Sequence, residues 1–410
     1  MELRSPLSAE ERIEKRKLIV RDVTALLTLF AITAVLATLT WLLFSSFTQH
    51  RKDLAQRWLT RGRAAMAAGH PDQAVIALRS ALEYQEGAPA AEQRETEIAL
   101  ASALAAAGRA NEATAYFNTL LEAAPGNGVI NLQLARLAAK QGHEAQAVES
   151  YQRALDGVWQ GDGYQRRLQV RLELVGYLLS LKEFSRAQGE LLTAAGNAPD
   201  EPEIKIRIAG LMEQAGDPQN AFLLYRKLAT EHKPPLEALE GAGRTAAALG
   251  RFQIARQFLA RALGDFALDK QPESERDAVR NQLASAVRLL SLYPDPDLTP
   301  RARTQRILRD VAIAQARFDG CLQKAQASAS PDSTNSQTVP GSLGALDARW
   351  QQVPPNLNLH SLEDDPDLQQ SLMTLVYDTE KVTAQTCGQP TGNDALLFEI
   401  AQAPWAIDQP

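Results

Sequence analysis

The stretch QAGDPQNAFLLYRKL, residues 214–228, contains the pattern that decides the fold. It starts with a turn built on Gly216, and a small residue, Ala221, follows five positions later. Tyr225 comes four positions after the alanine and Leu228 three after that, so these three side chains lie on one face of a helix. A small residue just after a turn lets two antiparallel helices approach closely. The stretch therefore predicts a helix hairpin.

The same pattern occurs six times, with a period near 34 residues. The small residues are Ala74, Ala113, Ala147, Ala187, Ala221 and Ala255, separated by 39, 34, 40, 34 and 34 positions. The large residues four positions later are Leu78, Phe117, Tyr151, Leu191, Tyr225 and Leu259, and Ala81, Leu120, Ala154, Ala194, Leu228 and Ala262 follow three further on. The two longer spacings predict loop insertions around Pro89 and around residues 161–163. In the fourth unit Lys182 replaces the turn glycine.

At these residues the chain resembles the tetratricopeptide repeat family, with Trp58-x-x-x-Gly62, Ala74, Leu78 and Ala81 as its first unit. The resemblance covers residues 54–268 as six units. It implies an all-α fold, a right-handed solenoid of helix hairpins whose concave side binds peptides or protein surfaces. The alternative is an unrelated bundle of alanine-rich helices.

Composition agrees with an all-α chain. Of the 410 residues, 67 are alanine, the best helix former, and only 6% are aromatic. The net charge of -6 and the pI near 5.6 argue against a nucleic-acid-binding protein, which would carry a basic surplus. Charge is also uneven, because residues 328–410 contain 11 acidic and 2 basic side chains.

A run of 25 residues without a charged side chain, residues 23–47, precedes the repeats. About 20 apolar residues cross a bilayer as a helix, and a cleaved signal peptide has a shorter apolar region. We therefore expect an uncleaved transmembrane anchor, with a buried core helix as the alternative. Residues 1–22 are expected to form a short cytosolic N-terminus, where Ser8 and Glu11 predict a helix start.

Basic residues flank this span on both sides, so the positive-inside count is nearly balanced. A long C-terminal domain translocates largely regardless of its charge. We therefore expect a single-pass protein of the cell inner membrane, with its N-terminus in the cytoplasm and its solenoid in the periplasm. Six basic residues precede the span and five follow it: Arg4, Arg12, Lys15, Arg16, Lys17 and Arg21, then Arg51, Lys52, Arg57, Arg61 and Arg63.

Three further segments follow the repeats. Residues 273–327 are expected to form two capping helices, since terminal repeats need a different outer face. Residues 328–344 are rich in Ser, Thr, Pro and Asn and predict a flexible linker. Residues 345–410 predict an acidic helical region, with one helix starting at Asp365-Pro366-Asp367 and ending at Cys387-Gly388, and a short last helix over residues 393–402.

Motifs for catalysis and metal binding are missing from the sequence. None of the five histidines stands at ligand or acid–base spacing from another histidine, a cysteine or an acidic cluster. The chain contains no Gly-rich phosphate loop, no Gly-x-Ser-x-Gly and no His-Glu-x-x-His. The acidic run from Glu363 to Asp367 suggests a cation site, but negative charge at a helix N-terminus explains it better. We therefore expect that the protein is not an enzyme and that it binds no cofactor and no small-molecule substrate.

The two cysteines, Cys321 and Cys387, lie 66 residues apart on either side of the predicted linker. In an oxidising compartment a disulfide between them would fasten the tail helix to the solenoid. The alternative is a pair of buried thiols that act as small hydrophobic residues.

Three arginines share one register on the first helices of their repeats. Arg63, Arg136 and Arg244 each stand eleven positions before the small alanine, and Lys140 lies one turn after Arg136. Arginine binds carboxylates through a planar fork. These residues therefore predict a groove for an acidic peptide or a chain terminus, whereas the simpler reading is ordinary solvated arginines.

These features together predict a membrane-tethered scaffold that binds protein partners near the membrane and helps assemble an envelope complex. A periplasmic chaperone is one alternative and requires an apolar groove. An accessory subunit of a larger membrane complex, held mainly by its anchor, is another. Candidates for the apolar groove are Leu59, Met66, Ile98, Leu132, Leu172 and Ile206.

Overall fold

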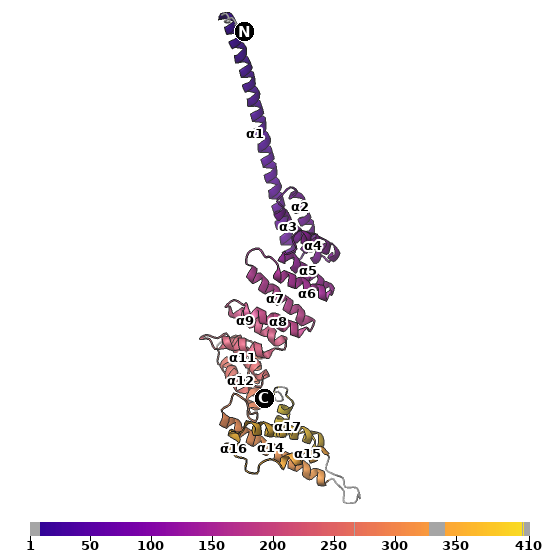
Figure 1. Cartoon of the computed structure of the whole chain (residues 1–410), viewed down its shortest axis with the longest axis vertical. Helices are drawn as coiled ribbons and strands as arrows, with labels where there is room; N and C mark the ends of the chain where they lie inside the picture. The colour runs from indigo at the N-terminus through magenta and orange to yellow at the C-terminus, as the bar shows by residue number, and fades with distance from the viewer. Residues whose placement is uncertain (1–8, 266, 328–340, 404, 406–410) are drawn as a thin grey trace, which may run out of the picture. The chain divides into compact units, whose positions relative to one another are not determined.

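The computed structural model describes residues 9–265, 267–327, 341–403 and 405 (Figure 1). Within these residues the regular elements are helices, and an isolated bridge between Asn127 and Val158 is the nearest approach to a sheet. The chain divides into two compact units, Met1–Val170 and Arg171–Pro410, which are described in turn.

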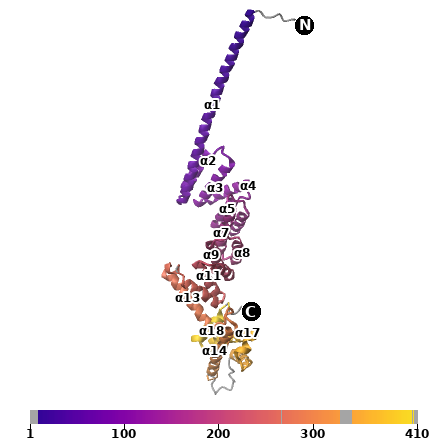
Figure 2. The same ribbon diagram turned by 90° about the vertical axis from the view of Figure 1, so that its left-hand side faces the viewer.

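Unit 1 begins with α1, one helix that spans Ala9–Ala67 without a break in either view (Figure 1 and Figure 2). It contains the apolar run of residues 23–47 and also the first helix of the first repeat. Residues 48–54 between these two parts are helical as well. In the part of the chain that the structure describes, α1 is the helix long and apolar enough to cross a membrane, a property that a signal sequence shares. Ser8 lies outside the described residues.

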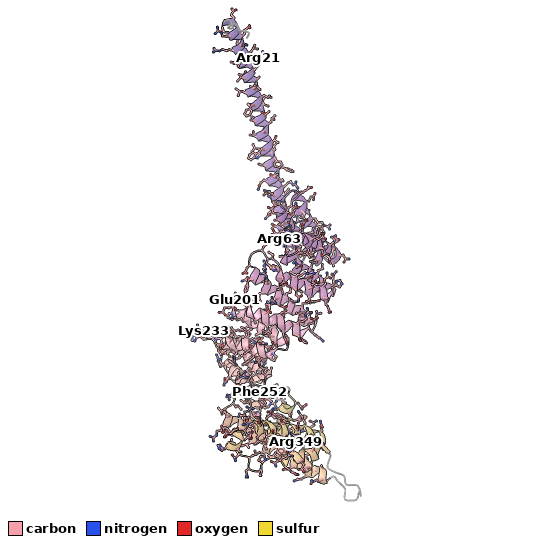
Figure 3. The ribbon with its side chains drawn as sticks, viewed as in Figure 1. Arg21, Arg63, Glu201, Lys233, Phe252 and Arg349 are labelled. Atoms are coloured by element: carbon pink, nitrogen blue, oxygen red, sulfur yellow. A yellow bond between two sulfur atoms is a disulfide. The ribbon has the colours of Figure 1, made fainter. Side chains whose placement is uncertain are left out.

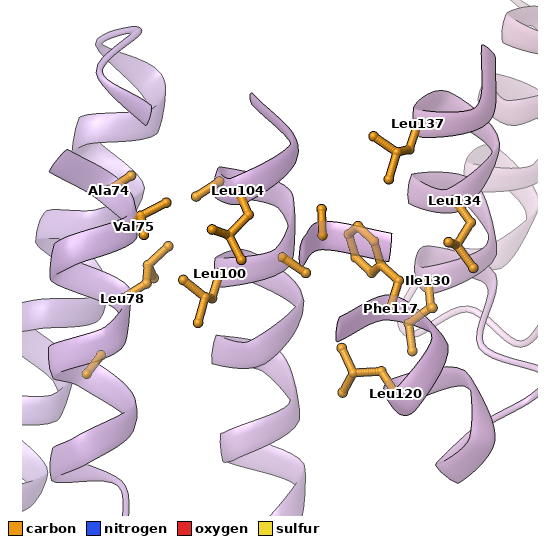
Figure 4. Packing of buried hydrophobic residues seen from close by; sticks show 14 of the residues in the cluster. Ala74, Val75, Leu78, Leu100, Leu104, Phe117, Leu120, Ile130, Leu134 and Leu137 are labelled. Carbon is orange, nitrogen blue, oxygen red and sulfur yellow. The ribbon is translucent and has the colours of Figure 1, made fainter. Parts of the chain in front are cut away.

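The repeats of unit 1 pair α1 with α2 (Pro71–Tyr84), α3 (Ala90–Ala106) with α4 (Ala110–Ala123), and α5 (Gly128–Gln141) with α6 (Glu144–Asp156). Figure 4 shows Leu100 and Leu104 of α3 packed toward Val75 of α2, and Phe117 of α4 packed toward Ile130 of α5. These side chains belong to one buried cluster, which therefore runs through all three repeats of this unit.

The boundary between the units falls inside α7 (Gly163–Ser180). Unit 2 continues with α8 (Phe184–Gly196), α9 (Pro202–Gln214), α10 (Pro218–Ala229), α11 (Leu236–Ala248) and α12 (Phe252–Leu263). After the short 3-10 helix η1 (Leu268–Lys270), α13 (Glu273–Leu290) packs on α12.

Each of the six predicted turns has the same backbone geometry. The turn residue has a positive φ, and the next amide donates a hydrogen bond of 2.9 Å to the carbonyl five residues earlier, as in His70 to Ala65. This is the Schellman arrangement, which satisfies a carbonyl left over at the helix end. Lys182, with φ 60°, is the one non-glycine with positive φ among the described residues. The glycines are Gly69, Gly108, Gly142, Gly216 and Gly250.

The repeated side chains are buried as their spacing requires. All six small alanines have 0% exposure, and none of the six large residues that follow exceeds 3%. A larger side chain at the alanines would push the two helices of a pair apart. The short-range pattern of the sequence is therefore also the packing pattern of the helix pairs.

An aromatic side chain fills the insertion before α7. Trp159 donates its indole N–H to the carbonyl of Ala154 at 2.9 Å. Its ring also covers Gly128, the first residue of α5, so closely that a Cβ there would lie 2.4 Å from it. The indole therefore takes the place of a side chain that Gly128 lacks.

The segment after the repeats differs in part from expectation. The second predicted capping helix, α14 (Pro300–Ala327), packs chiefly on α17 (Pro366–Cys387), so it belongs to a C-terminal bundle. Residues 341–344 were predicted to be linker but form the first turn of α15 (Gly341–Trp350), because Leu343 is fully buried. The remaining predicted linker, residues 328–340, lies outside the described residues.

Two further helices complete the C-terminal bundle, α16 (Leu359–Glu363) and α18 (Gly392–Gln402). Asp365 caps α17 by accepting the amide of Leu368 at 2.9 Å, which fits the helix-terminus explanation of the acidic run. A disulfide joins Cys321 of α14 to Cys387 of α17, with Cα atoms 5.7 Å apart. The surface against which α17 packs is thus mainly α14.

Candidate protein-binding groove

The four predicted groove residues fall in both units, as Arg63, Arg136 and Lys140 lie in unit 1 and Arg244 lies in unit 2. Arg136 and Lys140 are one turn apart on α5, and both are exposed. Arg63, labelled in Figure 3, lies on the last turns of α1.

Glutamates on neighbouring first helices hold two of the arginines. Arg63 forms an ion pair with Glu95 of α3, and both side chains are more than half exposed. Arg244 binds Glu213 of α9 through two hydrogen bonds of 2.8 Å, in the fork geometry expected of arginine. The hydrogen bonds to Glu213 are the main cause of the raised pKa of Arg244. A partner's carboxylate would have to compete with these glutamates.

Sequence reasoning missed both glutamates because they lie 32 and 31 residues from their arginines. The repeat register gave only a weak signal, because Glu95 and Glu213 stand 18 and 8 positions before their small alanines, whereas both arginines stand 11 positions before theirs. Exposed ion pairs contribute only about 0–1 kcal/mol. The pairs therefore lower the net charge along the first helices, but replacement of either glutamate by a partner's carboxylate would cost little free energy.

The apolar residues proposed for a chaperone groove are buried or partly buried. Leu59, Leu132 and Leu172 have exposures of 6%, 8% and 7%. Met66, Ile98 and Ile206 are partly buried. These positions hold the helix pairs together and leave little apolar surface for an unfolded client.

One repeat departs from this register. Leu59, Ile98, Leu132, Leu172 and Ile206 each stand fifteen positions before the small alanine, and in the sixth repeat the residue there is Glu240. Glu240 is half-buried, and its pKa is raised by burial and by the charges of Glu237 and Glu275, against the opposing effect of Arg244. The sequence pattern alone would have shown this exception had the register been followed through all six units.

The loop after α13 fixes the start of the last repeat's second helix. Asp295, fully buried, accepts the amide of Gln253 at 2.8 Å and thereby caps α12. Arg251 binds Asp297 through two hydrogen bonds of 2.8 Å. Phe252, labelled in Figure 3, is the first residue of α12 and lies in the sequence between Arg251 and Gln253, which make these contacts.

The C-terminal bundle contains two buried acids without hydrogen-bond partners. Asp310 of α14 and Glu380 of α17 have 0% exposure, and no carboxylate oxygen of either is hydrogen bonded. Burial raises the pKa of each to about 8. Arg317 lies 3.3 Å from Glu380 and donates to Thr383 at 2.8 Å, so it ties α14 to α17.

No group of three or more metal-ligating side chains is present among the described residues. Burial is the leading cause of the raised pKa of both buried acids, and the charge of Asp394 adds to it at Glu380. The described contacts of this bundle hold its helices together, as the Arg317 contacts to Thr383 and Glu380 do.

Comparison with known proteins finds family models that match the first part of the repeats. Two family models, both described as tetratricopeptide repeat, match residues 59–128 and 104–157. Residues 59–157 therefore match the tetratricopeptide repeat family. No curated protein matches the chain.

Several solved structures are similar to part of the chain at low identity. PilF of Pseudomonas aeruginosa is 17% identical, with 52% of this chain and 91% of that chain covered and a TM-score of 0.36. PilW, a type IV pilus biogenesis factor, is 16% identical, with 57% and 98% covered and a TM-score of 0.35. The TPR2AB domain of yeast Sti1, in a complex with pHSP90, is 15% identical, with 57% and 99% covered and a TM-score of 0.24.

Proposed function

We propose that this protein is a membrane-tethered interaction scaffold that helps to assemble or hold together an envelope complex. In this proposal residues 23–47 cross the cell inner membrane, the N-terminus is cytoplasmic and the repeats lie in the periplasm. The first helices of the repeats bind protein partners, with Arg63, Arg136, Lys140 and Arg244 as contact residues.

The observation that carries the proposal is the continuity of α1, whose apolar run and first repeat helix are one element. At 1.5 Å per residue, the 16 residues from Phe47 to Arg63 extend about 24 Å. A continuous helix transmits direction, whereas a flexible linker does not. The first binding helix would therefore stand at a set height above the membrane, which favours partners that are themselves near the membrane.

The cysteine pair supports export. Disulfides persist in oxidising compartments such as the periplasm and are rare in the cytosol. The Cys321 to Cys387 bond would be stable only if the C-terminal bundle is translocated. Protease added to spheroplasts should digest the repeats, and complete protection of the repeats would refute the orientation.

Site-specific photocrosslinking tests the binding surface. A photoreactive amino acid at Lys140, exposed on the first helix of the third repeat, should capture partners in intact membranes. The matched control is Gln152, exposed on the second helix of the same repeat. Equal yields at the two positions would contradict a role for the first-helix surface.

Replacement of the anchor distinguishes a scaffold from an accessory subunit. If residues 23–47 are exchanged for an unrelated membrane span, a scaffold should still give the crosslinks at Lys140. A subunit held mainly by its anchor should lose them. Loss of the crosslinks with normal membrane insertion would therefore favour the accessory subunit.

A further inference from the structure

A cleft of about 570 Å³ lies in the C-terminal bundle, outside the repeats. One wall is a stripe of α17 that runs from Asp367 to Lys381, and the other is formed by the loop between α13 and α14 and by the first turns of α14. At 1.5 Å per residue, this part of α17 extends about 21 Å. Extended chain rises about 3.3 Å per residue. The cleft therefore has the length of a short peptide segment of about six residues.

Contacts of its own hold the loop wall in place. Asp295 is fully buried and accepts the amides of Gln253 and Asp297, each at 2.8 Å. Pro294 and Pro296 line the cleft on either side of Asp295, and each fixes its own backbone φ. A segment that enters the cleft therefore meets a wall that is already ordered, which lowers the entropic cost of binding.

Part of the lining is apolar. Ile307 of α14 and Met373 of α17 have exposures of 1% and 8%, and Leu298 of the loop is half-buried. An aliphatic side chain that packs against them removes apolar surface from water on both sides of the contact.

The lining also contains an arginine without an acceptor. Among the described residues, the guanidinium of Arg303 forms no ion pair and no hydrogen bond. Its Nε is enclosed by protein, whereas its two terminal nitrogens are accessible and can donate in parallel to one carboxylate. A partly enclosed cation that lacks an acceptor costs free energy. A carboxylate in the cleft would remove this cost.

The acids in the same lining limit how much negative charge a ligand can carry. Asp378 is bound by Arg349 at 2.7 Å. Glu363 and Asp367, near the start of α17, would repel a second negative charge. A phosphate group, with a charge of about -2, is therefore disfavoured. A single carboxylate among uncharged residues suits both the arginine and the acids.

We propose that this cleft binds an extended peptide segment of a protein partner, in which one Glu or Asp is flanked by uncharged, largely aliphatic residues. The carboxylate accepts hydrogen bonds from the two terminal nitrogens of Arg303, and an aliphatic neighbour packs on Ile307 and Met373. The site lies outside the repeats, so it goes beyond the proposed first-helix surface and does not depend on it.

Peptide binding to the full chain in detergent micelles tests this site. The probe is the peptide Gly-Ala-Leu-Glu-Leu-Ala-Gly with an amidated C-terminus and a neutral fluorophore at its N-terminus, and the control peptide has Gln in place of Glu. Since Gln keeps the shape and removes the charge, fluorescence anisotropy should show about tenfold or more weaker binding of the Gln peptide. Added salt should weaken binding of the Glu peptide and leave that of the Gln peptide nearly unchanged.

Two arginines on the first turn of α14 provide matched variants. Arg303→Gln should weaken binding of the Glu peptide about tenfold or more and leave binding of the Gln peptide unchanged. Arg301 is exposed and stands outside the lining, so Arg301→Gln should leave the binding of both peptides unchanged. Arg303→Lys should retain only part of the affinity, because an ammonium group does not offer a planar fork.

A second pair, on α17, tests the cleft without changing Arg303. Thr374 is exposed and lines the cleft, so Thr374→Trp should fill it and weaken binding of both peptides about tenfold or more. Gln385 is exposed on the same helix outside the lining, and Gln385→Trp should leave binding unchanged. Circular dichroism and thermal unfolding check that each variant keeps its fold.

Equal affinity of the Glu and Gln peptides, an equal effect of Arg303→Gln and Arg301→Gln, full binding by Thr374→Trp, or no measurable binding of the Glu peptide would overturn the site. If Arg303→Gln unfolds the bundle, the comparison of peptides and the pair on α17 still decide the question. Crosslinking at Lys140 reports on the first-helix surface alone, so failure of the cleft leaves that proposal standing.

Discussion

The turn at Lys182 offers a direct test of the backbone argument. Lys182 has φ 60°, in a position where the other five repeats have glycine, and its side chain is exposed. A non-glycine residue in the left-handed region costs about 1–2 kcal/mol. Glycine loses about 0.5–1 kcal/mol more backbone entropy on folding. Lys182→Gly should therefore stabilise the fourth repeat by about 0.5–1 kcal/mol.

Gly216, in the next turn, is the matched control for the opposite change. It has φ 73°, and a Cβ there would meet nothing within 4 Å, so Gly216→Ala changes backbone preference without a steric clash. It should destabilise the fifth repeat by about the same 0.5–1 kcal/mol.

Native-state hydrogen exchange is the suitable measurement because it reports on each helix separately, whereas arrays of repeats need not unfold in one step. A change of about 0.7 kcal/mol alters the opening equilibrium about threefold. The amides of α8 should exchange about threefold more slowly in Lys182→Gly, and those of α10 about threefold faster in Gly216→Ala. Faster exchange in Lys182→Gly would refute the assignment of strain to this turn.

Three further predictions concern packing, pH and the disulfide. Gly128→Ala should lower stability by about 1–3 kcal/mol, since its Cβ would lie 2.4 Å from the ring of Trp159, whereas Gly126→Ala meets nothing within 4 Å and should be neutral in thermal unfolding. Burial raises the pKa of Asp310 from its ordinary value of 3.8 to about 8, so the folded state holds this proton more tightly than the unfolded state. The resulting stabilisation is full below the ordinary pKa of 3.8 and falls by up to about 1.4 kcal/mol per pH unit as the pH rises to 8. Asp310→Asn should remove this pH-dependent contribution to stability, and the difference in Tm between pH 5 and pH 8 should therefore shrink. Cys321→Ala removes a disulfide between two residues 66 positions apart and should lower the free energy of unfolding by about 4 kcal/mol in the chain-entropy model. Mass mapping without reductant should find the bond in the native protein.

The repeats could be read from the sequence because their constraints are local. A positive φ at a turn selects glycine, and close approach of two helices selects alanine within the next five residues. Gly216 and Ala221 meet both conditions within one short stretch. Lys182 could be recognised as an exception only because five other turns defined the rule.

Long-range partners could not be read in the same way. Arg244 and Glu213 lie on neighbouring first helices at registers that differ by three positions, but many charged pairs share such a separation. Which of them meet depends on the offset between helices, which the period does not determine. The same limit applies to residues 341–344, where a composition rich in small residues hid the burial of Leu343.

The first helices illustrate how a repeat register and its exceptions carry different information. Five units place an aliphatic residue where the sixth has Glu240, and the aliphatic residues pack between helices. A carboxylate in that position adds no packing, and its raised pKa shows that the site disfavours its charge. Such a residue weakens the solenoid unless a cation compensates it, and Arg244, one turn later on α11, supplies that cation, because its charge lowers the pKa of Glu240 against the effect of burial. The exception in the sixth unit therefore comes with its own compensating charge, since Arg244 interacts with Glu240 on the same helix and with Glu213 on the neighbouring one.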